Sequence, residues 1–252
     1  LVYSNYETGT ISDTRSFNGG WYSNRKGKDS RESNRIGLKY DLVSENGIFD
    51  TMSVSLDDQT LDFVANTEQH VKYNFGPFFR ADEDRVDSRS FNQESKQLKV
   101  DFAKDIEGDA TSHSFVYGLE YQDKEFENKQ MRRSNSLYND LGWVDRNIGA
   151  LIPASEAQVS TLYAMDTIEI GENSKIRFGS RFDDYQYDAE SNEDFSDSTG
   201  TLGETKFSAF NWAVGYEQNL SEALTATIGV STGFRVPTIE EMYSTSGSVD
   251  DW

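Results

Sequence analysis

The stretch LTATIGVSTGF, residues 224–234, alternates strictly between two kinds of side chain. Every second residue from Leu224 to Phe234 is apolar apart from Thr232, whereas the residues between them are threonine, glycine and serine. Successive side chains of a β-strand point to opposite faces of the sheet. This period of two therefore predicts a strand with one apolar face and one small, polar face.

The same alternation recurs along most of the chain and predicts an all-β, antiparallel fold. In residues 210–216, for example, Phe, Trp, Val and Tyr alternate with Asn, Ala and Gly. A soluble β-sandwich and a transmembrane β-barrel both show such a pattern. We expect strands near residues 35–42, 51–57, 97–104, 113–122, 158–170, 175–187, 206–218 and 224–235.

The links between the expected strands favour the barrel. Short links of residues 43–51, 105–112, 171–174 and 219–223 alternate with long ones of residues 58–97, 123–157 and 188–205. Short turns at one end and long loops at the other are typical of outer-membrane barrels. Long loops without structure are uncommon in compact soluble domains. We also expect the polar residues 1–34 to form a long loop, and the acidic residues 183–197 to lie in a solvated one.

Composition excludes several other classes of protein. The 252 residues carry 44 Asp and Glu against 24 Lys and Arg, a net charge of −20. Nucleic acid is therefore not an expected partner, because its phosphates need a basic surface. The absence of cysteine excludes disulfide scaffolds and thiol catalysis. No known catalytic motif occurs, so we expect no enzyme, although an outer-membrane hydrolase is the enzymatic alternative.

A more specific signal follows the last expected strand. The segment Gly233–Tyr243 reads GFRVPTIEEMY, and it resembles the box F-R-A-P-x-x-x-E-L-Y of TonB-dependent outer-membrane receptors. Phe234, Arg235, Pro237, Glu241 and Tyr243 match the box, whereas Val236 and Met242 replace its Ala and Leu. Proline cannot donate a ladder hydrogen bond, so we expect Pro237 to end the strand. Arg235 is expected to face the lumen and Phe234 the lipid.

Two further elements are similar to this family. The segment Phe178-Gly179-Ser180-Arg181-Phe182-Asp183 resembles a Gly-x-Arg-aromatic-Asp element of its barrels. Residues 152–155 (IPAS) resemble a short Phe-Pro-x-Ser element of the heme and haemoglobin branch. That branch often holds heme through a histidine in the loop after the box, and no histidine lies between Pro237 and Trp252.

The resemblance implies that residues 1–252 are about eight or nine strands of a larger barrel of the 22-stranded class, plugged by a separate domain. We expect the plug and the TonB box to lie outside these residues. The implied protein sits in the outer membrane of a Gram-negative bacterium, among lipid and lipopolysaccharide, and works with the TonB complex. It would import iron as heme or from a heme-carrying protein. A ferric-siderophore or other nutrient receptor is the alternative, and a passive porin or adhesin barrel is a second.

Few residues are candidates for ligand binding. His70 lies in an aromatic neighbourhood and could touch a heme, although a loop histidine is the commoner explanation. Arg132 and Arg133 could meet a heme propionate or an anionic siderophore. His113 is expected at a periplasmic turn, where a ligand role is improbable. We expect no metal site and no intrinsic cofactor, with heme possible only as transported ligand.

Overall fold

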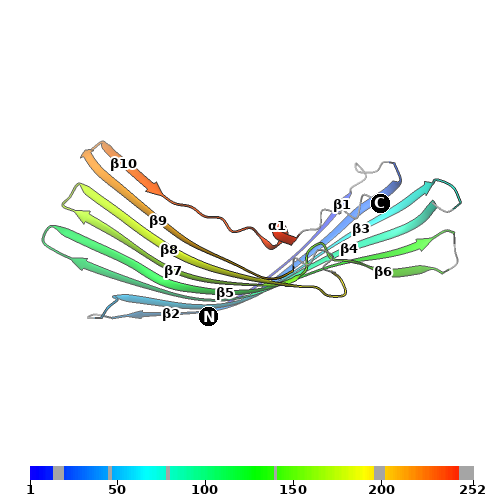
Figure 1. Cartoon of the computed structure of the whole chain (residues 1–252), viewed down its shortest axis with the longest axis horizontal. Helices are drawn as coiled ribbons and strands as arrows, with labels where there is room; N and C mark the ends of the chain where they lie inside the picture. Colours follow the sequence, from blue (N-terminus) through cyan, green and yellow to red (C-terminus); the bar gives the residue numbers. More distant parts are fainter. Residues whose placement is uncertain (14–19, 45–46, 78–79, 139–140, 196–201, 244–252) are drawn as a thin grey trace.

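The computed structural model describes residues 1–13, 20–44, 47–77, 80–138, 141–195 and 202–243. These residues form one antiparallel, ten-stranded sheet and one short helix (Figure 1). The elements are β1 (Val2–Asp13), β2 (Tyr22–Val43), β3 (Thr51–Asn74), β4 (Arg80–Glu107), β5 (Thr111–Ser136), β6 (Trp143–Gly149), β7 (Ala154–Ile170), β8 (Ser174–Glu190), β9 (Gly203–Ser221), β10 (Leu224–Ser231) and α1 (Ile239–Tyr243). The predicted all-β, antiparallel fold is therefore confirmed.

One face of the sheet, here called the outer face, carries a continuous apolar band. Directly paired residues of antiparallel strands share a face, and the register places one apolar or aromatic side chain after another across seven strands. Tyr40, Leu162 and Phe210 in this row are 58%, 62% and 62% exposed. The complete row is Tyr40, Val54, Val100, Leu119, Leu162, Phe182 and Phe210.

The opposite, inner face is polar at the same level. The neighbouring row pairs Lys39 with Ser55, Lys99 with Glu120, and Thr161 with Asp183. Charged groups on this face bind one another: Arg181 donates from Nε to both carboxylate oxygens of Asp183, at 2.8 and 2.9 Å. A sheet with one apolar and one polar, hydrogen-bonded face is what a barrel wall between lipid and a wet lumen requires.

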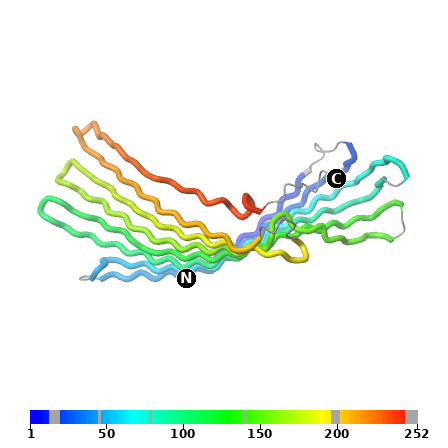
Figure 2. The backbone as a smooth tube through the Cα atoms, in the orientation of Figure 1, coloured from blue at the N-terminus to red at the C-terminus, as the bar shows by residue number. Residues whose placement is uncertain are grey.

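The strands are much longer than a bilayer needs. A transmembrane strand takes about 9–11 residues, whereas β3, β4 and β5 have 24, 28 and 26. The surplus lies on one side of the apolar band and forms a second region, here called the wing: β1, β6 and residues 22–34, 60–74, 80–94 and 125–136. From Leu56 to Asn74, strand β3 covers roughly 60 Å at about 3.3 Å per residue. In Figure 2 the wing is the half that holds β1, β6 and the tips of β3 and β4.

The structure corrects three predictions. Residues 1–34, expected as a loop, form β1 and most of β2, and the long links 58–97 and 123–157 are mainly strand. The last strand ends at Ser231 and not at 235. The wing carries polar side chains on both faces, so its strands show no strict apolar period. Their backbone groups are satisfied by the ladder, and polar side chains pair across it, as Asn92 Nδ2 and Asp62 Oδ1 do at 2.6 Å.

The sheet forks at β5. Residues 111–126 of β5 pair with β7, whereas residues 130–135 pair with β6. A small core fills the fork: Ile152 and Phe195 are 6% and 8% exposed, and Pro153 is fully buried. Asp194 fixes the β8–β9 connection there, because its backbone oxygen accepts from the Ala150 amide at 2.8 Å. The expected acidic loop is thus only partly a loop: it begins as the end of β8, and its residues 196 and 197 lie outside the described residues.

Beyond the apolar band, and past a mixed polar row that includes Lys96, Asp123 and Lys206, the outer face carries a row of carboxylates. Neighbouring members stand opposite one another on adjacent strands, an arrangement that like charges disfavour. We call it the acidic row: Glu94, Glu125, Glu156, Asp188 and Glu204. Among the described residues, no helix has the length and apolar character to cross a membrane.

Candidate functional site

The box after β10 forms a compact turn built around Glu241. Thr238 and Glu241 cap α1 reciprocally: the Glu241 amide donates to Thr238 Oγ1 at 3.3 Å, and the Thr238 amide donates to Glu241 Oε2 at 2.9 Å. This is a capping box. The other carboxylate oxygen of Glu241 accepts from the Arg235 guanidinium. Arg235 and the Thr238 amide hold the pKa of the Glu241 carboxyl below its usual range.

One hydroxyl contact fixes the helix to the sheet, and one helix residue is buried. Ile239 is buried at 6% exposure, and the hydroxyls of Tyr243 and Thr205 lie 3.2 Å apart. Thr205 is on the inner face, because it lies an odd number of residues from the outer-face residue Phe210 on β9. Pairing of β10 continues past Ser231 only through the Thr232 amide, which donates to the Trp212 oxygen. Phe234 is 52% exposed. Arg235 and Glu241 therefore join in one turn and Tyr243 contacts the sheet, so the geometry explains these three box residues as structure.

His70 lies on the outer face of the wing. Its Nδ1 is 2.9 Å from an Asp84 carboxylate oxygen, and its Nε2 is 3.1 Å from one of Asp82. Lys72 binds the second oxygen of Asp82 at 2.7 Å and holds the pKa of that carboxyl below its usual range. Both ring nitrogens thus face carboxylates, and iron ligation by His70 requires one of these contacts to break.

His113 lies near the opposite end of the sheet. Its Nδ1 is 2.9 Å from Asp166 Oδ2, and its ring stacks on that of Phe115 at 5.5 Å. In β5 the side chain of His113 shares the outer face with Leu119, six residues further along the strand. The two histidines of the sequence therefore both lie on the outer face, and the structure does not bring them together.

Arg132 and Arg133 are neighbours in sequence and lie on opposite faces. Arg133 faces outward, 3.6 Å from Asp145 and 5.3 Å from the ring of Trp143. Arg132 faces inward and donates from Nε to Asp87 at 2.7 Å. The candidate pair suggested by the sequence is thus split, and only Arg132 belongs to the inner face.

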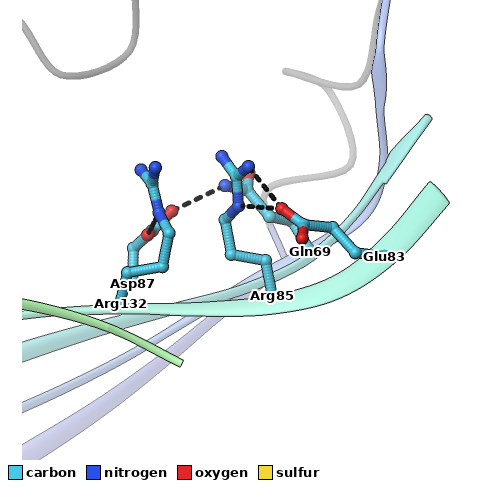
Figure 3. A network of polar contacts seen from close by, with 5 residues as sticks. All are labelled: Gln69, Glu83, Arg85, Asp87 and Arg132. Atoms are coloured by element: carbon cyan, nitrogen blue, oxygen red, sulfur yellow. Dashed lines mark hydrogen bonds and ion pairs between the residues drawn. The ribbon is translucent and has the colours of Figure 1, made fainter. Parts of the chain in front are cut away.

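Arg132 belongs to a polar network that spans β3, β4 and β5 (Figure 3). Gln69 Nε2 donates to the second oxygen of Asp87 at 2.9 Å, and Arg85 donates to Glu83 through Nε and a terminal nitrogen at 3.1 and 2.5 Å. Gln69 and Arg85 are only 5% and 8% exposed. The sequence prediction missed this network because these residues were assigned to loops. Period-two spacing of 85, 87 and 89 and of 130 and 132 could have placed them on one face.

In the described part of the chain, no group of three or more His, Cys, Asp or Glu side chains is arranged to hold a metal ion. The site is therefore a wall of hydrogen-bonding and guanidinium groups. What such a surface can do is bind polar or anionic molecules, and position them without reacting with them.

Comparison with known proteins agrees with this architecture. No curated protein matches the sequence. Among solved structures, BauA, the ferric preacinetobactin receptor from Acinetobacter baumannii, is similar at 10% identity and a TM-score of 0.50, over 81% of this chain and 30% of that one. The siderophore receptor PiuA from the same species is 13% identical, with a TM-score of 0.46, over 80% and 32%. The chain thus spans about a third of the length of these structures. The family model described as "TonB dependent receptor-like, beta-barrel" matches residues 2–251, and the chain belongs to this family.

Proposed function

We propose that the chain forms part of the barrel wall of an outer-membrane receptor that imports a ferric siderophore or a similar anionic iron chelate, with energy supplied through TonB. The choice of ligand rests on the residues of the inner face of the wing. This face presents Arg85 and Arg132 at less than one-fifth side-chain exposure, whereas both histidines lie on the outer face. A ferric chelate with anionic arms needs guanidinium groups, and heme iron needs an axial ligand.

Membrane insertion is supported by the exposed apolar band. A row of large apolar side chains over seven strands is far more than the scattered exposed apolar residues of a soluble surface. Lipid covers such a band without loss of backbone hydrogen bonds, because every wall strand is paired on both sides except at the sheet edges. The acidic row lies beyond the band on the same face, one polar row further along the strands. It fits a boundary between acyl chains and the aqueous outer surface, next to lipopolysaccharide.

In this proposal the wing and the membrane-spanning wall have different roles. The wing meets the ligand outside the bilayer, and the polar inner face of the wall lines the path inward. A plug that closes the lumen, and its release by TonB, are parts of the proposed mechanism that lie outside this chain. BauA, which shares the fold, is by its name a receptor for a ferric chelate, in agreement with the proposal.

Import of heme, or of iron from a heme-carrying protein, is the second candidate. It is favoured by the Ile152–Ser155 element, whose resemblance to the heme branch comes from sequence. In the structure this element closes the fork: Ser155 Oγ donates to the Pro153 oxygen at 3.0 Å, and Pro153 is fully buried. Packing explains the element without heme, so the siderophore proposal takes precedence.

Uptake of radioactive iron by iron-starved cells tests the proposal. Cells that express the full-length receptor are compared with a deletion strain and with a strain that lacks TonB. Each is supplied with an anionic ferric siderophore, a neutral one, or hemin. We expect receptor- and TonB-dependent uptake of the anionic chelate. Uptake that persists without TonB would indicate a passive porin, and uptake of iron from hemin alone would establish the heme candidate. A Soret titration of the purified receptor with hemin then tests direct binding.

A further inference from the structure

The inner face of the wing contains a preorganised patch with unsatisfied hydrogen-bonding groups. It covers three residues on each of β3, β4 and β5, in register. The patch comprises Ala65, Thr67, Gln69, Arg85, Asp87, Arg89, Gln130, Arg132 and Ser134. Gln69, Arg85, Gln130 and Ser134 are 5%, 8%, 2% and 4% exposed. Polar side chains buried to this degree are normally fully hydrogen-bonded.

Two buried amide atoms in the patch lack a partner among the described residues: Gln69 Oε1 and Gln130 Nε2. The identity of the first is fixed by chemistry. Ionised Asp87 can only accept, so the atom of Gln69 that contacts it at 2.9 Å must be the NH₂ group. The carbonyl oxygen of Gln69 is therefore a buried acceptor that needs a donor. An unsatisfied buried group of this kind is costly, and it indicates that a group outside the described residues completes the patch.

The carboxylates of Asp87 and Glu83 fix the two guanidinium groups in an orientation that suits ligand binding. Asp87 engages Arg132 through Nε, so its two terminal nitrogens point away from the sheet (Figure 3). Glu83 engages Arg85 through Nε and one terminal nitrogen. Figure 3 shows the two guanidinium groups side by side and directed the same way. The outward edge of a guanidinium matches the two oxygens of a carboxylate.

Charge supports an anionic guest. Arg146 stands directly opposite Arg132 on the same face, where two cations repel each other. An anion between them relieves this repulsion. The outer face of the same strands shows the contrary sign, with the acidic row. On the inner face of the wing, Arg85, Arg132 and Arg146 are thus brought together on neighbouring strands.

We propose that this patch binds a carboxylate that carries a neighbouring hydroxyl, as an arm of a ferric chelate. The carboxylate accepts from Arg132, Arg85 and Gln130, and the hydroxyl donates to Gln69 Oε1. This assignment rests on the proposed function, because it names the ligand chemistry of the receptor. It adds a defined subsite in the wing, well outside the bilayer, and it assigns the residues that distinguish a hydroxycarboxylate from a simple anion.

Calorimetric titration of the purified full-length receptor with citrate tests the subsite, and tricarballylate, the same tricarboxylate without the hydroxyl, is the comparison ligand. Arg132→Gln is the test variant, and Arg133→Gln is the matched control, because the adjacent side chain lies on the other face. We expect citrate to bind, Arg132→Gln to weaken binding at least about tenfold, and Arg133→Gln to leave it unchanged. Tricarballylate should bind more weakly than citrate to the unaltered receptor.

Arg132→Gln leaves Asp87 without its cation, and this could impair folding. The double variant Asp87→Asn/Arg132→Gln removes both charges, and Arg132→Lys keeps the charge but loses the planar fork. Both are expected to fold and to bind citrate more weakly. Equal effects of Arg132→Gln and Arg133→Gln, or no citrate binding at millimolar concentration, overturn the subsite. Equal binding of tricarballylate overturns the role of the hydroxyl.

These outcomes are separable from failure of the proposed function. Citrate binding that depends on Arg132, in a receptor that supports no TonB-dependent iron uptake, would refute the transport proposal and leave the subsite standing. TonB-dependent uptake of an anionic chelate by a receptor with no Arg132-dependent citrate binding would do the reverse.

Discussion

Replacing Val214 with arginine tests which face of the sheet meets lipid. Val214 lies near the middle of the apolar band on β9, between Phe178 of β8 and Val230 of β10, and it is 39% exposed. Arginine on the lipid face of a barrel costs about 2–4 kcal/mol at the bilayer midplane. That corresponds to a roughly 30-fold to 900-fold fall in the folding equilibrium constant. Against a typical stability of about 5–15 kcal/mol, this is a large loss.

The adjacent residue supplies the control. Ala213 points to the inner face and pairs with Gly179 and Ser231, so it has only small neighbours. Arginine there enters a wet lumen, and a change within about 0.5 kcal/mol is expected, as for other solvated sites. The assay is reversible guanidinium unfolding of the full-length receptor in lipid vesicles, with tryptophan fluorescence as the signal. If Ala213→Arg costs as much as Val214→Arg, or more, the assignment of faces is wrong.

Three further outcomes follow from local geometry. The depressed pKa of Glu241 means that its stabilisation of the box is present above the ordinary glutamate pKa of about 4.3 and is lost as pH falls through the lower folded value. Amide exchange of residues 238–243, corrected for intrinsic rates, should therefore quicken below about pH 4, and Glu241→Gln should abolish that pH dependence. Glu125→Gln, between Glu94 and Glu156 in the acidic row, should stabilise the sheet by about 0.2–1 kcal/mol at low salt. An effect that survives in high salt, where charges are screened, would contradict repulsion as its cause. Gly149→Ala should destabilise by about 1–3 kcal/mol, because Gly149 has φ +97° and a Cβ there would meet the Asp194 oxygen at 2.8 Å. Thermal unfolding measures this loss, and Gly179→Ala, with no atom within 4 Å of the new Cβ, is the control.

The wall could be predicted from sequence because lipid imposes a rule on it. Each residue such as Leu162 or Phe210 must be apolar, and its neighbours must not be, so the period of two is visible in the residues themselves. The wing could not be predicted in this way, because lipid imposes no such rule on it. Residues 60–74 carry polar side chains on both faces, and what fixes them is the continuation of the ladder and pairs such as Asp62 with Asn92. Those partners lie 30 positions apart, and no local pattern reveals them.

The box was recognised by its resemblance to the family, and its internal structure was missed. Thr238-x-x-Glu241 is the pattern of a capping box, and it could have predicted the short helix after Pro237. The sequence prediction extended β10 to residue 235. It therefore placed Arg235 on the lumen side from the alternation of the strand before it. The structure shows that the strand has already ended at Ser231, so the direction of Arg235 follows from its contact with Glu241.

The continuous ladder through wall and wing also determines how such a receptor can change length. Residues removed in equal numbers from β3 and β4, on either side of their shared turn, leave every pair below them in place, as for Leu56 with Leu98. An even number keeps each remaining side chain of the wing on its face, whereas an odd number exchanges the inner and outer faces of everything above the cut. Hairpins of this kind can be lengthened or trimmed in steps of two residues per strand. The ligand-facing surface can diverge in this way while the membrane-spanning part stays in register.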